Sequence, residues 1–102
     1  MPYQAPVGEY QFIFDQVVPL GPVVANEYFS EATQDLTDAV LNECGKMCDT
    51  VMAPLQRPGD LHPAKLENGV VRTSPGFVEG YAAIAKSGWV GISATPAHGG
   101  MG

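Results

Sequence analysis

Basic residues are scarce in this sequence of 102 residues. Five lysine and arginine residues stand against eleven aspartate and glutamate residues, which gives a formal net charge of −6. Charged residues make up 16% of the chain, whereas about 25% is usual for a soluble domain. Nucleic acids and anionic membrane surfaces bind clustered lysine and arginine side chains. We therefore expect neither a nucleic-acid partner nor a membrane-surface partner.

Long apolar runs are also missing. No run approaches the roughly 20 residues that a transmembrane helix needs, and residues 1–6 lack the basic start and apolar stretch of a signal peptide. We therefore expect no membrane span and a cytoplasmic location. In that reducing compartment, Cys44 and Cys48 are expected to stay thiols rather than to form a disulfide.

The sequence is richer in apolar residues at helical spacing. Apolar side chains recur every three or four residues over 9–18 and, more strongly, over 35–53, which predicts two amphipathic helices. Pro19 and Pro54 are expected to end them. A short helical turn is expected over 26–32. The apolar faces consist of Tyr10, Ile13, Phe14, Val17 and Val18 in the first helix and Leu36, Val40, Cys44, Met47, Val51 and Leu55 along the second.

Two positions of the longer helix carry further expectations. Thr33 or Asp35 is the expected N-cap, because hydroxyl and carboxylate oxygens accept from the free amides of the first turn. Gly45 lies inside the helix, where glycine costs about 1 kcal/mol relative to alanine. We interpret it as the place where another helix approaches closely.

The second half of the chain holds most of the glycine, with ten of the twelve residues at or after Gly45. Residues 56–64 contain two prolines and a glycine and are expected to form a loop. Asn68–Gly69 predicts a β-hairpin over 65–73, since both positions of its turn need positive φ. Ser74 is expected to cap a helix that starts with Pro75 and ends before Gly88.

Together these elements predict one domain of mainly α structure with one short β-hairpin. We expect an extended arm over 1–8, helices over 9–55, the hairpin over 65–73, a helix over 74–88 and a glycine-rich exit segment over 89–102. Metal ligands are few, because Cys44 and Cys48 would need two further ligands, and the histidines, His62 and His98, lie in separate segments. The residues alone predict no metal site, no catalytic residue, and cysteines that are buried and apolar.

The order of motifs resembles that of one known family. The motifs are YQAPV (3–7), FIFDQVV (12–18), DLTDAVLNECGKMCDTVMAPL (35–55), LENGVVRTSPGF (66–77), SGWVGI (87–92) and GGMG (99–102). In combination they resemble the N-terminal helical region of acyl-CoA dehydrogenases, and most of all the bacterial branch that includes 3-methylmercaptopropionyl-CoA dehydrogenase. The resemblance covers essentially the whole chain. It departs at TPAH (95–98), where the family usually carries two acids.

The resemblance implies a small orthogonal helical bundle that forms the N-terminal domain of an FAD-dependent acyl-CoA dehydrogenase. Such an enzyme takes a proton from Cα of an acyl-CoA thioester with a glutamate base, while FAD accepts a hydride from Cβ. The flavin-binding and catalytic domains are absent here. The resemblance therefore places no catalytic or cofactor-binding residue in this chain, and it implies that the chain alone binds no FAD and is inactive.

For the parent enzyme, the resemblance implies an acyl-CoA substrate, an electron-transfer flavoprotein as partner and a homo-oligomer. It places the final turn beside the substrate, so the candidate substrate-adjacent residues are Gly99, Gly100, Met101 and Gly102. Two alternatives stay open. One is a free-standing helical interaction module derived from that domain, and the other is a small redox or metal protein built on Cys44 and Cys48.

Overall fold

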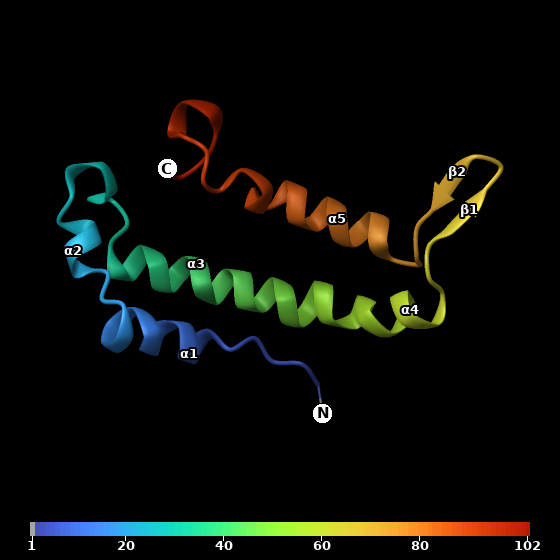
Figure 1. The fold of residues 1–102 in the computed structure, drawn as a ribbon, viewed down its shortest axis with the longest axis horizontal. Helices are drawn as coiled ribbons and strands as arrows, with labels where there is room; N and C mark the ends of the chain where they lie inside the picture. Colours follow the sequence, from blue (N-terminus) through green and yellow to red (C-terminus); the bar gives the residue numbers. More distant parts are fainter. Residues whose placement is uncertain (1) are drawn as a thin grey trace. The chain divides into compact units, whose positions relative to one another are not determined.

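The protein is mainly helical, and its computed structural model describes residues 2–102. The chain forms two compact units, the first ending at Asp49 and the second comprising Thr50–Gly102. Helices make up most of both units (Figure 1), and the sheet in the described residues has two strands. The prediction of a mainly α chain with one β-hairpin is therefore confirmed.

The first unit begins with the helix predicted over 9–18. Helix α1 (Val7–Phe12) passes directly into a π-helical turn, Ile13–Val17. Val18 then leaves the helical region with φ −126° and ψ 78°, as expected for a residue that precedes proline. The prediction that Pro19 ends this helix is confirmed, although the helix starts two residues earlier than expected.

Two short helical segments connect this helix to the long one. Helix α2 (Gly21–Val24) was not expected, yet it has proline in its first turn, a position where the missing N–H costs nothing. The turn expected over 26–32 is a 3₁₀ turn, Glu27–Phe29. The side chain of Asn26 caps it by accepting from the amide of Tyr28 at 2.9 Å.

The long helix α3 (Gln34–Met47) is capped by Thr33, whose Oγ1 accepts from the amide of Leu36 at 3.3 Å. This confirms one of the two expected caps. Past Met47 the backbone continues as a π-helical turn, Cys48–Met52, and as a 3₁₀ turn, Ala53–Leu55.

The prediction of a loop over 56–64 is wrong for its first six residues, which form helix α4 (Gln56–Leu61). Pro54 lies at the start of the 3₁₀ turn and Pro58 in the first turn of α4. Amides at such positions have no helical acceptor, so proline costs little there. Pro54 therefore changes the type of helix instead of ending the helical path.

Helix α1 and the arm before it run along α3 (Figure 1). Gly45 is buried, and a Cβ built on it would lie 2.7 Å from Cγ2 of Val7. The expectation that Gly45 allows a close helix contact is therefore confirmed. The arm is also fixed by a hydrogen bond in which the amide of Ala5 donates to the carboxylate of Asp49 at 2.7 Å.

The hairpin of the second unit is formed as predicted. Strands β1 (Lys65–Glu67) and β2 (Val70–Arg72) pair antiparallel, with Lys65 opposite Arg72. Asn68 and Gly69 have φ values of 50° and 76°, which are the two positive values that a type I′ turn requires. All six strand residues are exposed.

The helix after the hairpin is α5 (Phe77–Lys86), and the expected cap at Ser74 is wrong. The carbonyl of Ser74 instead accepts from the amide of Phe77 at 3.2 Å, and Gly76 has φ 81°. A proline followed by a glycine with positive φ is the preferred centre of a type II turn. The chain therefore turns at Pro75–Gly76 before α5 begins.

Within residues 2–102, no large apolar side chain is buried. Among the described residues the buried ones are Gly45, Ser74 and Gly80. In the first unit, Phe12 and Val17 are each 61% exposed, although both belong to the helical path that packs along α3. The helices carry the apolar faces that the sequence predicts, but much of the surface of these faces is exposed to solvent. No helix within residues 2–102 has the length and apolar character to span a membrane.

Candidate functional site

The expected substrate-adjacent residues form a folded turn at the end of the second unit. Gly99 takes φ 83° directly after a 3₁₀ turn, Pro96–His98. The next three amides all donate to carbonyl groups a few residues back: Gly100 to Thr95 at 3.2 Å, Met101 to Ile92 at 2.9 Å and Gly102 to Ala94 at 2.9 Å. The segment is therefore held in place by its own backbone.

Two contacts within this exit turn restrict it further. A Cβ at Gly100 would overlap the carbonyl oxygen of Ala94, so the turn can form only with glycine there. Oγ1 of Thr95 and Nδ1 of His98 are hydrogen-bonded at 2.9 Å. The motif that departs from the family pattern thus stabilises the turn locally. That the turn lies beside a substrate stays a prediction.

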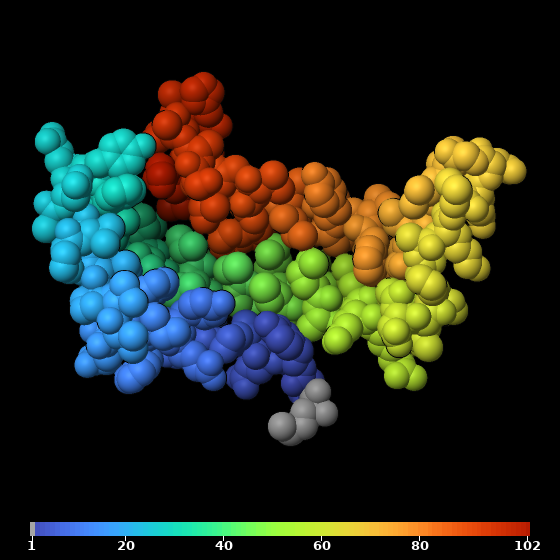
Figure 2. All heavy atoms as spheres, in the orientation of Figure 1, coloured from blue at the N-terminus to red at the C-terminus, as the bar shows by residue number. Residues whose placement is uncertain are grey.

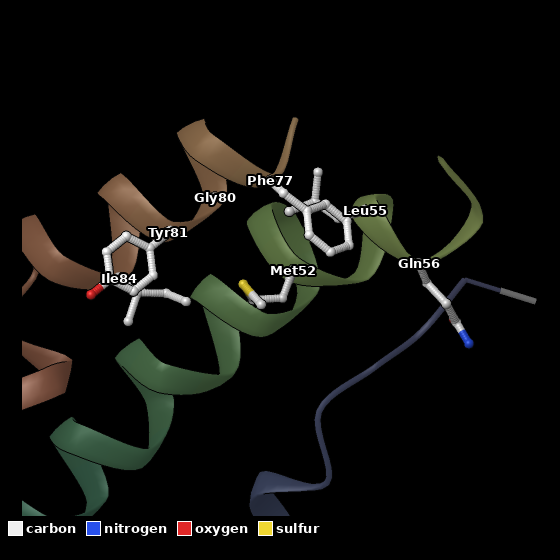
Figure 3. A pocket seen from close by; sticks show the side chains of 7 residues that line it. All are labelled: Met52, Leu55, Gln56, Phe77, Gly80, Tyr81 and Ile84. Atoms are coloured by element: carbon white, nitrogen blue, oxygen red, sulfur yellow. The ribbon is translucent and has the colours of Figure 1, made fainter. Parts of the chain in front are cut away.

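The second unit also carries a cavity of about 300 Å³ that sequence reasoning missed. It lies between the helical path around α4 and helix α5, and Figure 3 shows its lining: Met52, Leu55, Gln56, Phe77, Gly80, Tyr81 and Ile84. The sequence predicted helical segments around Leu55 and around Gly80 but not that they pack against each other. None of the four expected site residues, 99–102, lines the cavity.

Two glycines explain how the cavity forms. A Cβ at Gly76 would lie 2.7 Å from Cδ2 of Leu55, and a Cβ at Gly80 would overlap Cδ1 of the same side chain. Leu55 therefore packs against the backbone at Gly76 and Gly80 and is one of the residues that line the cavity. Two glycines four residues apart can accept a leucine from a neighbouring helix. The sequence predicts this contact only if the neighbouring helix is already known.

The lining is suited to an apolar group and to little else. It contains no charged side chain, and the side chain of Gln56 points away from the other labelled side chains in Figure 3. A flavin dinucleotide needs cations or free amides for its pyrophosphate. The residues of this cavity do not fit FAD, and they include no acid or base placed for proton transfer.

The two cysteines are free and half-buried rather than buried as expected. Burial raises the pKa of the Cys48 thiol, and the neighbouring Cys44 and Asp49 raise it further. A raised pKa lowers the thiolate fraction at neutral pH, which makes Cys48 a poor nucleophile. Within residues 2–102, no three His, Cys, Asp or Glu side chains are grouped closely enough to hold a metal ion.

Comparison with known proteins agrees with the motif pattern. No family model matches the chain. The sequence is 37% identical over all 102 residues to 3-methylmercaptopropionyl-CoA dehydrogenase of Ruegeria pomeroyi, and it spans 17% of that protein's length. The resemblance inferred from the motifs is therefore confirmed: the chain is related over its full length to a member of the acyl-CoA dehydrogenase family.

Proposed function

We propose that this chain is the N-terminal helical domain of an FAD-dependent acyl-CoA dehydrogenase. The observation that carries the proposal is the identity of 37% over the full chain to a dehydrogenase of which the chain spans 17%. The uncovered apolar side chains support it, because large exposed apolar surfaces mark places where other protein parts pack. That residues 1–102 act as one domain of the parent is part of this proposal.

In the parent, the chain covers one side of the acyl-CoA site, and the exit turn 99–102 lies beside the acyl group. The backbone hydrogen bonds of this turn and the lack of a side chain at Gly100 support a rigid wall that approaches its ligand closely. Bound FAD would supply the hydride acceptor. Since the residues of the cavity do not fit FAD, we assign the flavin site and the base to other parts of the parent.

The remaining assignments follow from the same relationship. We propose 3-methylmercaptopropionyl-CoA as the first substrate to test, because the similar protein carries that name. We further propose a cytoplasmic homo-oligomer that passes electrons to an electron-transfer flavoprotein.

The test uses the full-length protein that contains this segment. Purified protein is expected to show a flavin absorbance spectrum, and anaerobic addition of 3-methylmercaptopropionyl-CoA is expected to bleach it. The isolated chain of 102 residues, prepared in parallel with added FAD, is expected to remain colourless and inactive. A full-length protein that neither carries nor accepts flavin contradicts the proposal, and so does a flavin spectrum of the isolated chain.

The uncovered apolar faces also fit the second candidate, a free-standing helical interaction module derived from this domain. The transcript distinguishes the two. A coding region that continues for several hundred codons after Gly102 supports the dehydrogenase, whereas a stop codon at that point supports the module.

A further inference from the structure

The register of the hairpin places two cationic side chains directly opposite each other. Lys65 pairs with Arg72 across β1 and β2. Side chains of directly opposed residues leave the same face of a sheet, with their Cβ atoms about 4.5–5.5 Å apart. Like charges in this position destabilise a hairpin. A bound anion would turn this repulsion into two favourable contacts.

The protein itself does not supply that anion. Lys46 forms an ion pair with Glu43. Within residues 2–102, neither Lys65 nor Arg72 forms an ion pair with an acidic side chain. Glu67 shares their face of the hairpin, two positions along from Lys65, without pairing with either cation. Both strands are exposed along their whole length, and Figure 2 shows the hairpin, in yellow, with its surface open.

The wider charge distribution also favours an anion in this part of the chain. Thr50–Gly102 contains four basic and three acidic residues, whereas residues 1–49 contain one basic and eight acidic residues. Opposite charges attract over about a Debye length, ~8–10 Å at physiological ionic strength. The hairpin carries half of the four basic residues of the second unit, and it holds them side by side.

We propose that Lys65 and Arg72 bind a phosphate group at the nucleotide end of the CoA thioester. The identification of the ligand as CoA rests on the proposed function. The pairing of Lys65 with Arg72 is independent of that function, because it follows from the register of the hairpin. A guanidinium group binds two phosphate oxygens at once through its planar fork, and an ammonium group adds a mobile point charge. A phosphate with two negative charges matches the two cations. The site binds the nucleotide and takes no part in the chemistry.

The first experiment measures phosphate binding directly. The chain of 102 residues, labelled with ¹⁵N, is titrated at low salt with adenosine 3′,5′-bisphosphate and, separately, with pyrophosphate. Saturable amide shifts confined to residues 64–73 are expected. Lys65→Gln and Arg72→Gln are each expected to weaken binding by about two- to fivefold, the range of an exposed ion pair. Both variants remove the like-charge pair, so they leave the hairpin at least as stable as before.

Lys86→Gln and Arg57→Gln are the matched controls, because each removes one cation of the same unit outside the hairpin. Their binding is expected to equal that of the unchanged chain. The absence of shifts in the hairpin overturns the proposal. Equal weakening by the control variants also overturns it, because general electrostatic attraction then explains the binding. Both ligands carry phosphate groups of the kind found at the nucleotide end of CoA, so saturable binding of either one at the hairpin supports the proposal.

A second experiment uses the full-length protein and separates KM from kcat. Arg72→Gln is expected to raise KM for the CoA thioester by about two- to fivefold, to leave kcat unchanged, and to leave both constants unchanged for the matching pantetheine thioester, which lacks the nucleotide. An equal effect on the pantetheine thioester contradicts the hairpin site. Phosphate binding by a full-length protein without dehydrogenase activity would support the hairpin site and overturn the proposed function.

Discussion

Leu55 occupies the space that a side chain at Gly80 would need. Its Cδ1 would overlap a Cβ built on Gly80, and its Cδ2 lies 2.7 Å from the position of a Cβ on Gly76. One methyl group of Leu55 faces Gly76 and the other faces Gly80, so a side chain at either glycine would require Leu55 to move. This one side chain therefore fixes how closely α5 approaches the helical path before it.

Replacing Gly80 by alanine is accordingly expected to destabilise the second unit. Overpacking of this kind costs about 1–3 kcal/mol, although alanine is the better helix former by about 1 kcal/mol. The midpoint of thermal unfolding, followed by circular dichroism, should fall. Gly91→Ala is the control, since a Cβ there meets nothing within 4 Å and the residue has no positive φ. Equal midpoints for the two variants would show that Leu55 does not restrict Gly80.

A second prediction concerns the contact between α1 and α3. Gly45→Ala places a methyl group 2.7 Å from Cγ2 of Val7 and is expected to lower the free energy of unfolding by about 1–2 kcal/mol. Val7→Ala removes the opposing methyl groups. In the double variant the cost of Gly45→Ala should therefore shrink, and chemical denaturation of all four proteins gives the coupling energy. Additive costs would contradict a direct contact between the two residues.

The reactivity of Cys48 follows from its raised pKa. At neutral pH its alkylation by iodoacetamide is expected to be slower than that of the same cysteine in urea, and the midpoint of the rise of its rate with pH should lie above that of an ordinary thiol. Cys44→Ala removes a neighbour that raises this pKa, so alkylation of Cys48 should become faster at the same pH. A rate that does not change in this variant would argue against the coupling of the two thiols.

The raised pKa of Cys48 also makes the stability of the folded protein depend on pH. A folded-state pKa above the unfolded value favours the protonated thiol in the folded protein. Its contribution is complete below the unfolded pKa of the thiol and is lost as the pH rises through the folded value. The free energy of unfolding should therefore decrease on the alkaline side, and less so in Cys48→Ala.

A further prediction is that the isolated chain associates with itself. Exposed apolar side chains of α1 and its π-helical turn, such as Phe12 and Val17, lie uncovered at 61% each, and surfaces of this kind promote association. Light scattering at increasing concentration should give a mass above 10.8 kDa. Phe12→Ser combined with Val17→Ser should lower the apparent mass. A monomer at high concentration would contradict the prediction.

Local chemistry made several elements predictable from the sequence. The hairpin follows from Asn68–Gly69, the cap of α3 from Thr33, and the close contact at Gly45 from a glycine inside an otherwise strong helix. The errors came from proline and glycine with more than one allowed role. Pro58 lies in a first turn rather than in a loop, and Pro75–Gly76 forms a type II turn, a signal that was visible beside Ser74.

The cavity could not be predicted, because it depends on which segments meet. Leu55 lies about 20 residues or more from Gly76 and Gly80 in the sequence, and periodicity within one helix says nothing about the partner of that helix. The exit turn was partly predictable. Its glycines indicated a turn. The hydrogen bond between Thr95 and His98, and the overlap of a Cβ at Gly100 with the carbonyl of Ala94, could be found only in the structure.

The lack of buried large apolar side chains in the described part of the chain also governs how the protein responds to heat and denaturant. The heat-capacity change of unfolding and the slope of stability against denaturant concentration both grow with the apolar surface that unfolding newly exposes. Here much of that surface already meets water in the folded chain. The isolated chain should therefore unfold over a broad range, and a sharp, cooperative transition belongs to the assembly in which these faces are covered.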